Sequence, residues 1–299
     1  MNCNLCPRKC GADRAAGQLG VCGQTEELKV ARAALHYWEE PCISGEEGSG
    51  AVFFSGCPLH CVFCQNENIA SGTTGKKITV PRLSEIFLEL QEKGANNINL
   101  VTPGHFVPQI IKALDRARTD GLYLPVVYNT SSYENVDTIR MLEGYVDIYL
   151  PDFKYMEPDL AQNFSHAPDY VERAKAAIKE MVRQSGSCQF GEDGYIRRGT
   201  IVRHLILPGH TKNSRKVLRY LHVTYGEDIY ISIMNQYTPV REFGEFKELN
   251  RKVTKREYEK ILDAAVEMGI QNGFIQEGET ASESFIPEFD YEGVEKNTP

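Results

Sequence analysis

The sequence predicts an α/β fold, a parallel sheet or barrel of alternating strands and helices behind a small cysteine-rich N-terminal module. Two observations predict it. Short apolar runs recur along the chain and are separated by segments with helical periodicity, which is typical of strands buried on both faces. Polar or reactive residues follow each run, as they do where a (βα) barrel gathers its active site at the carboxyl ends of the strands.

The apolar runs mark the expected strands, which cover residues 51–54, 98–101, 124–128, 145–150, 200–207, 229–234 and 273–275. Amphipathic helices are expected between most of them. Residues 83–90 and 110–117 carry apolar stripes at spacings of three and four, and another helix is expected over 168–184. Thr254 and Glu257 form a capping box that begins a helix before the last strand.

The first strand leads directly into a loop with three cysteines, Cys57, Cys61 and Cys64, spaced Cys-x3-Cys-x2-Cys. Thiolates this close together can converge on one iron–sulfur cluster. A structural zinc ion would need a fourth protein ligand, and none stands nearby in the sequence. Three ligands on a cluster of four irons leave one iron free, so the loop predicts a [4Fe–4S] cluster with an open position.

This loop resembles the signature of the radical S-adenosylmethionine (SAM) superfamily, and Cys64-Gln65-Asn66 resembles the activating enzymes of glycyl radical enzymes. The resemblance implies a partial (βα)6-type radical SAM barrel in which SAM chelates the open iron. It also implies that one electron splits SAM into methionine and a 5′-deoxyadenosyl radical, which abstracts hydrogen from a protein glycine. A flavodoxin- or ferredoxin-type donor would supply the electron, and the substrate would be a protein or peptide.

The resemblance also assigns residues to SAM. The expected contacts are Asn66, Gly104, Thr130, Asp152, Lys154, Asn235 and Gln236. Gly104 stands where the family carries a Gly-Gly-Glu-type motif, but the acidic member is missing. Asp152 and Lys154 match an Asp-x-Lys element, in which the lysine ammonium can pair with the SAM carboxylate.

Two charged residues are assigned by the same resemblance to the substrate and to catalysis. Glu47 matches an acidic residue that precedes a Gly-x-Gly segment, and Arg203 matches an arginine that orients the substrate loop. Arg203 also lies inside an apolar run, where a buried charge requires a partner. The neighbouring His204 is expected to be a hydrogen-bonded barrel residue rather than a ligand.

A second cysteine group opens the chain and comprises Cys3, Cys6, Cys10 and Cys22. Four cysteines with a leading Cys-x2-Cys fit a structural zinc ion and equally a second iron–sulfur cluster, and their spacing does not choose between the two. Activating enzymes carry additional clusters after the first cluster loop, so this module departs from their pattern. Cys42 is expected to be a buried structural thiol, and Cys188 is unassigned.

Composition restricts the remaining classes of function. The chain has 299 residues, of which 41% are hydrophobic, enough for one large core and a small module. A net charge of −8 argues against non-specific nucleic-acid binding, and no apolar run approaches the roughly 20 residues of a membrane span. Nine cysteines behind an N-terminus without an apolar signal segment predict a cytoplasmic protein, metal ligation rather than disulfides, and anaerobic conditions.

We expect a cysteine-rich module over residues 1–35, the barrel over 36–280 and an acidic C-terminal tail over 281–299. Residues 155–199 exceed a typical crossover and form either a lid or a surface insertion. Two alternatives to glycine activation remain, namely radical modification of another peptide or a small metabolite, and a non-catalytic iron–sulfur electron carrier. The polar residues at the strand ends argue against a carrier, because electron transfer needs no substrate site.

Overall fold

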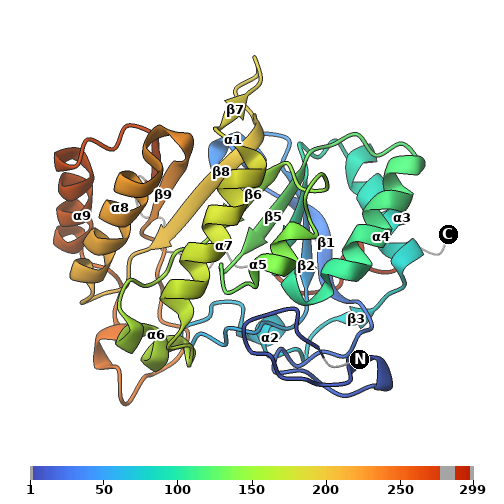
Figure 1. The fold of residues 1–299 in the computed structure, drawn as a ribbon, viewed down its shortest axis with the longest axis horizontal. Helices are drawn as coiled ribbons and strands as arrows, with labels where there is room; N and C mark the ends of the chain where they lie inside the picture. Colours follow the sequence, from blue (N-terminus) through green and yellow to red (C-terminus); the bar gives the residue numbers. More distant parts are fainter. Residues whose placement is uncertain (1–2, 277–286, 297–299) are drawn as a thin grey trace.

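The computed structural model describes residues 3–276 and 287–296, and a mostly parallel sheet flanked by helices forms its centre (Figure 1). The strand order is β10-β9-β8-β6-β5-β4-β2-β1-β3, and β7 (Gln189–Phe190) pairs with β8 outside this path. Because the path has two ends, the described strands form a partial barrel, which confirms the predicted fold class.

The seven predicted strands are all present and run parallel to one another. They are β2 (Ser49–Phe54), β4 (Ile98–Val101), β5 (Val126–Thr130), β6 (Ile148–Pro151), β8 (Ile196–Leu205), β9 (Tyr230–Met234) and β10 (Gly273–Ile275). The carboxyl ends of all seven therefore lie at one end of the barrel, where the loops that follow them can share a pocket.

Helices connect the strands and cover the convex side of the sheet (Figure 1). The longer ones are α3 (Val80–Glu92), α4 (Val107–Thr119), α6 (Pro158–Ser165), α7 (Tyr170–Ser185), α8 (Thr211–Tyr225) and α9 (Lys255–Glu267), and the short ones are α1 (Pro41–Ser44), α2 (Glu67–Ala70) and α5 (Val136–Arg140). The capping box of Thr254 and Glu257 at the start of α9 is confirmed. Short 3-10 turns occur at Arg14–Ala16, Gly104–Phe106, Gly226–Asp228 and Lys247–Asn250.

The core lies in layers on the two sides of the sheet. Val126 and Tyr128 belong to the core cluster that includes α3 and α4, whereas Val127 between them belongs to the cluster that includes Ile43 of α1. This alternation follows from the two-residue period of a strand. The short helix α1 thus fills the amino-terminal end of the barrel and leaves the carboxyl end for the pocket.

The N-terminal part of the chain joins this sheet through β1 (Lys29–His36), which runs antiparallel to β2 and also pairs with β3 (Lys76–Lys77). The module boundary expected at residue 35 therefore falls inside a strand. β1 was not predicted, because Arg32 and three alanines leave it without a long apolar run. The segment with the four N-terminal cysteines precedes β1 and lies at the carboxyl end of the strands (Figure 1).

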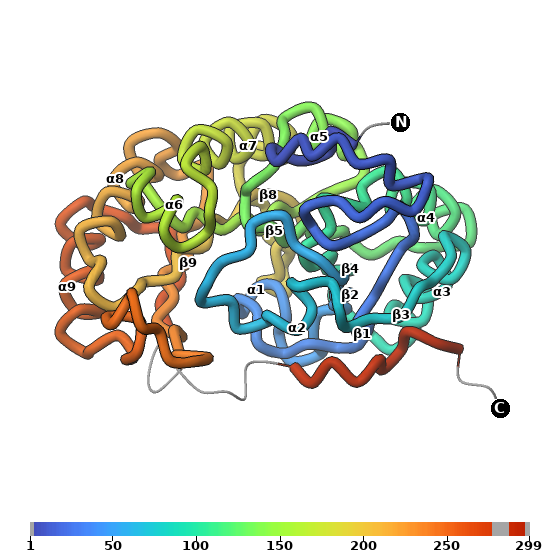
Figure 2. Tube along the Cα trace, turned by 90° about the horizontal axis from the view of Figure 1, so that it is seen from below, coloured from blue at the N-terminus to red at the C-terminus, as the bar shows by residue number. Residues whose placement is uncertain are grey.

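The described part of the C-terminal tail, residues 287–296, wraps along β1 (Figure 2). The backbone N–H of Ala33 donates to the carbonyl oxygen of Glu292 at 2.8 Å, and that of Tyr291 donates to the oxygen of Ala31 at 3.2 Å. Val294 is completely buried against the core beneath α3. The tail therefore covers the outer edge of β1.

The long segment before β8 contains α6, α7 and the short strand β7. Figure 1 shows β7 at the end of the barrel opposite the N-terminal segment. Among the described residues, none between 155 and 202 lines the pocket at the carboxyl end. This segment does not cover the pocket as a lid would, and it is not a surface insertion either, because Tyr155, Phe164 and Tyr170 are buried in the core. No helix in the described ranges combines the length and the apolar character that a membrane crossing requires.

Candidate active site

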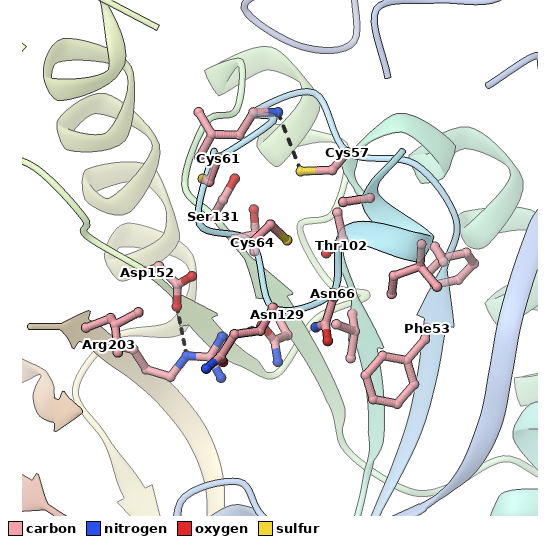
Figure 3. Close-up of a pocket in the computed structure, with 18 of the residues that line it drawn as sticks. Phe53, Cys57, Cys61, Cys64, Asn66, Thr102, Asn129, Ser131, Asp152 and Arg203 are labelled. Atoms are coloured by element: carbon pink, nitrogen blue, oxygen red, sulfur yellow. Dashed lines mark hydrogen bonds and ion pairs between the residues drawn. The ribbon is translucent and has the colours of Figure 1, made fainter. Parts of the chain in front are cut away.

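The cysteine loop begins where β2 ends and turns sharply toward the barrel (Figure 3). Gly56 and His60 adopt left-handed backbone conformations, with φ of 92° and 55°. A Cβ added at Gly56 would lie 2.5 Å from the carbonyl oxygen of Cys22, so only glycine fits there. The three cysteines that line the resulting pocket are Cys57, Cys61 and Cys64. The structure thus brings together the three predicted cluster ligands.

These thiols fit a cluster by their chemistry. Burial and the neighbouring cysteines raise the pKa of Cys57 to about 11 and that of Cys64 to about 12. Thiols of this kind need a cationic partner to become thiolates, and bound iron provides one. Within residues 3–276 and 287–296, no three ligand groups lie close enough to hold a single ion. A [4Fe–4S] cluster does not require three ligands on a single ion, because each cysteine binds a different iron.

Opposite the cysteines, the ends of β6 and β8 carry a network of charged side chains (Figure 3). Asp152 accepts from Lys154 Nζ at 2.6 Å through one oxygen and from Arg203 Nε at 2.9 Å through the other. Arg203 also binds Glu39 at 2.9 Å and donates to the Asn129 side chain at 2.6 Å. The buried charge that the sequence placed inside an apolar strand therefore has three partners.

Asp152 and Lys154 remain ionised despite burial. Burial alone would raise the pKa of Asp152, but the adjacent Lys154 and Arg203 outweigh it and lower that pKa. Burial would likewise lower the pKa of Lys154, and the negative charges of Asp152 and Cys61 raise it instead. A carboxylate and an ammonium group are therefore held ready on the pocket wall that faces the cysteines.

Sequence analysis missed Glu39. It lies between β1 and α1, and its side chain reaches into the barrel, where it accepts hydrogen bonds from Asn99 at 3.0 Å and from Asn129 at 3.1 Å. Only the polar character of Asn99 and Asn129 within apolar strands signals a buried acceptor, because such amides need partners.

The structure does not bring Glu47, the other residue assigned to the substrate, into this pocket. Glu47 is exposed just before β2 begins, at the amino-terminal end of the barrel. It accepts hydrogen bonds from the Tyr195 hydroxyl at 2.6 Å and from Asn96 at 3.4 Å. The acidic side chain that lies inside the barrel is that of Glu39, and the role assigned to Glu47 stays a prediction.

The expected SAM contacts divide into two groups. Five of them line the pocket together with the cysteines, namely Asn66, Thr130, Asp152, Lys154 and Gln236. Gly104 and Asn235 are not among the lining residues. Thr102, from the same turn as Gly104, lines the pocket instead. Gln236 accepts a hydrogen bond from Gln276 at 2.8 Å through its side chain and one from Gln65 at 3.1 Å through its backbone oxygen.

A buried carboxylate, Glu134, lies behind the pocket wall against Gly104. A Cβ at Gly104 would approach Glu134 Oε1 to 2.5 Å. The same oxygen accepts from Thr130 at 2.7 Å and from Tyr128 at 3.2 Å, while burial raises the pKa of Glu134 to about 7. An acidic group from the loop after β5 thus lies beside the turn that follows β4, although it does not face the pocket.

The four N-terminal cysteines also come together. Cys10 hydrogen-bonds with Cys3, and the added Cβ of Gly20 would lie within 3.4 Å of both the Cys10 and Cys22 sulfur atoms. Burial raises the pKa of Cys6 to about 12, and the nearby Cys22 and Cys3 add to this rise. Cys42 is buried within α1 and Cys188 is half-buried beside β8, so neither belongs to either group.

Comparison with known proteins agrees with this geometry. The model of the radical SAM superfamily matches residues 51–221, more than half of the chain, and the chain therefore belongs to this superfamily. Its members are enzymes that use a [4Fe–4S] cluster to cleave SAM reductively, which rules against the electron-carrier alternative.

An uncharacterized protein of Methanocaldococcus jannaschii is 27% identical over 274 residues, which cover 88% of this chain and 74% of that protein. A radical SAM methyltransferase of Sphaerobacter thermophilus matches 76% of this chain and 66% of its own at 14% identity, with a TM-score of 0.53, which shows a shared fold. SuiB of Streptococcus suis, bound to its precursor peptide SuiA, matches 75% of this chain at 10% identity with a TM-score of 0.49. The chain spans 47% of SuiB, about half its length.

Proposed function

We propose that this enzyme abstracts a hydrogen atom from a glycine of a protein substrate, as an activating enzyme of a glycyl radical enzyme does. The observation that carries the proposal is one pocket lined by the three cluster-loop cysteines and, opposite them, by the paired Asp152 and Lys154. When bound, the cluster and SAM supply a 5′-deoxyadenosyl radical. Cys57, Cys61 and Cys64 would hold the cluster.

The charged residues of the pocket suit the binding of SAM. Lys154 can donate to the carboxylate of SAM, and Asp152 can accept from its ribose or methionine groups, because both remain ionised. Thr130, Asn66 and Gln236 provide further polar contacts around the same space. Arg203 orients Asp152 and Glu39 by binding both carboxylates.

A protein substrate fits the wall of the pocket beside β1. Trp38 is 55% exposed and lines this side together with Phe53 and Pro287. Aromatic and apolar groups at a pocket rim bind extended peptide well, and a glycine has no side chain to hinder the approach of its Cα to the centre. The resemblance of Cys64-Gln65-Asn66 to the activating enzymes supports the same substrate class.

Two further components belong to this proposal. Cys3, Cys6, Cys10 and Cys22 would bind a second metal, either zinc or an iron–sulfur cluster; their thiols lie near one another, and a single zinc ion would have to draw them closer together. A flavodoxin- or ferredoxin-type protein would supply the electron that the cleavage of SAM consumes.

The first prediction tests this function in anaerobically reconstituted protein with a low-potential reductant. Alanine at Cys57, Cys61 or Cys64 should abolish the formation of 5′-deoxyadenosine, because each thiolate holds a separate iron. Cys188→Ala is the matched control, since Cys188 lies outside both cysteine groups, and it should retain cleavage. Cleavage that persists in a cluster-loop variant would contradict the assignment.

The substrate is identified in the same preparation by trapping partner proteins under anaerobic, reducing conditions. A glycine-centred radical should appear in the captured protein by electron paramagnetic resonance, with one 5′-deoxyadenosine formed per radical. Consumption of a small metabolite without a protein radical would instead favour the alternative substrate class.

A further inference from the structure

The N-terminal cysteine segment lies directly against the cluster loop (Figures 1 and 2). His60 Nε2 hydrogen-bonds to the carbonyl oxygen of Val21 at 2.7 Å, and the Cys22 carbonyl occupies the space that a side chain at Gly56 would need. Gly56 and His60 flank Cys57 on both sides. The two groups of cysteines are therefore neighbours in space although the strand β1 separates them in sequence.

The side chain of Arg8 also connects the two groups, through several bonds. It donates to the carbonyl oxygen of Pro58 at 2.8 Å and to that of Leu59 at 3.2 Å within the cluster loop. It also donates to the oxygens of Ser165 at 3.0 Å and His166 at 2.5 Å, where α6 ends. A guanidinium has five N–H donors in a fixed plane, which allows one residue to bind two loops at once.

The second loop that Arg8 binds also contacts a cluster ligand. The hydroxyl of Ser165 donates to the sulfur of Cys61 at 3.1 Å. Arg8 therefore holds the backbone on one side of Cys61 through Pro58 and Leu59, and positions a direct hydrogen-bond donor to its sulfur through the end of α6. Outer contacts of this kind orient metal ligands and influence how strongly they bind.

The backbone around Arg8 is arranged as it is around the cluster ligands. For five of the seven cysteines in the two groups, the backbone N–H two residues later hydrogen-bonds to the sulfur. The pairs are Cys6 with Arg8, Cys10 with Ala12 and Cys22 with Gln24 in the N-terminal segment, and Cys57 with Leu59 and Cys64 with Asn66 in the cluster loop. The backbone partners of Cys188, by contrast, are Thr200 and Tyr230, which are distant in sequence.

Arg8 thus contacts both metal groups with different atoms. Its backbone N–H binds the sulfur of Cys6, and its side chain binds the cluster loop. A metal that fixes Cys6 and Cys10 fixes the backbone on both sides of Arg8. The direction of the guanidinium then follows from the metal site, since a short segment held at two points has few remaining conformations.

We propose that the N-terminal cysteines form a metal site that braces the cluster loop, with Arg8 as the positioning residue between them. This inference rests on the proposed function only in that Cys57, Cys61 and Cys64 bind the catalytic cluster. It assigns the N-terminal metal the task of holding these ligands in place, whether that metal is zinc or iron.

The experiment compares full-length Arg8→Gln, Cys10→Ser and the double variant, each reconstituted anaerobically. Metal analysis identifies the N-terminal metal and shows whether it is retained. The rate at which a chelator removes the catalytic cluster, and the resonance spectrum of the reduced cluster with and without SAM, report the state of the cluster loop. Lys9→Gln is the matched control, because it removes one charge from the same segment without touching the cluster loop.

Arg8→Gln should keep the N-terminal metal but lose the catalytic cluster about 10- to 100-fold faster, the usual effect of removing an outer contact to a metal ligand. Cys10→Ser should lose the N-terminal metal and show the same faster loss. The double variant should lose the catalytic cluster no faster than the more affected single variant, because both changes break the same connection. Arg8→Lys should be intermediate, since an ammonium cannot reach four carbonyl groups at once.

The inference is overturned if Arg8→Gln matches Lys9→Gln in chelation rate and spectrum, or if the effects of the two changes multiply. Cys10→Ser with full metal content would overturn the second metal site itself. These readouts do not depend on turnover. If Arg8→Gln and Cys10→Ser destabilise the cluster in a protein that does not cleave SAM, this inference holds and the proposed function is rejected. If the protein cleaves SAM but neither variant affects the cluster, the proposed function holds and this inference is rejected.

Discussion

Asp152 is the residue on which the charges of the pocket depend. It is shared between Lys154 and Arg203, one on each carboxylate oxygen. The sequence treated Lys154 as a contact of SAM and Arg203 as an independent contact of the substrate. The structure instead places both cations on one carboxylate, so a change at either of them alters the other's partner.

We therefore predict that SAM binding responds to both residues. Lys154→Ala should weaken binding by about 1–3 kcal/mol, the range for losing a charge-assisted hydrogen bond. Arg203→Ala should also weaken it, because Lys154 then carries the whole of the Asp152 charge and is less available to SAM. The loss in the double variant should differ from the sum by about 0.5–3 kcal/mol, as expected for residues in one network.

Equilibrium titration with SAM measures these losses. Lys112→Ala, an exposed lysine on α4, should leave the affinity unchanged. An unchanged affinity in Arg203→Ala, or strictly additive losses, would restore the independent roles.

At the scale of elements, Glu134 ties β5 to the turn that follows β4. It accepts from Tyr128 and Thr130 on β5, and it fills the space beside Gly104. Thr130 also lines the pocket, so this carboxyl group supports one wall of the site from behind. The junction therefore depends on the carboxyl group of Glu134, and burial opposes the ionisation of this group.

This junction should make the stability of the protein depend on pH. Burial raises the pKa of Glu134 from 4.5 to about 7, so the folded state binds one more proton than the unfolded chain between these values. Its contribution to the free energy of unfolding is therefore fully present below pH about 4.5 and is lost as pH rises through about 7. The slope for one such group is at most about 1.4 kcal/mol per pH unit.

Glu134→Gln keeps an oxygen for Thr130 and Tyr128 but does not titrate. Thermal unfolding measured across this window should show the wild-type protein losing stability relative to the variant as pH rises. Glu92→Gln, on the exposed end of α3, provides the control. Parallel curves for wild type and Glu134→Gln would show that the carboxyl group does not titrate in the window.

At the scale of the whole molecule, the partial barrel leaves β1 near an open edge, and residues 287–296 cover it (Figure 2). The same segment supplies Pro287 to the pocket and packs Phe289 against Phe53. The end of the chain thus contributes to the stability of the sheet and to one wall of the site. An uncovered strand edge would be open to pairing with other chains.

Deletion of residues 287–299 should therefore lower the melting temperature and promote self-association. Exposure of Val294 alone should cost about 1.5–3 kcal/mol of unfolding free energy. Calorimetry and size-exclusion chromatography measure the two effects. Deletion of only residues 297–299 is the control. A deletion variant that stays monomeric and equally stable would show that the tail does not protect the edge.

The sequence by itself determined the parallel strands, the helices α3, α4, α7 and α9, and the cysteine loop that follows the first parallel strand. Each of these is a local property, since strand burial, helical periodicity and the spacing within one loop all lie within a few neighbouring residues. The pairs that depend on one short segment, such as Thr254 with Glu257, could be predicted for the same reason.

Only the tertiary structure decided which distant residues share the pocket. The chain after β1, a strand without a clear apolar run, turns Glu39 into the barrel, while Glu47 lies at the other end. Arg8 reached the cluster loop because the chain folds back before β1. Contacts between such segments depend on how strands and loops pack in space, and no local pattern of residues encodes that arrangement.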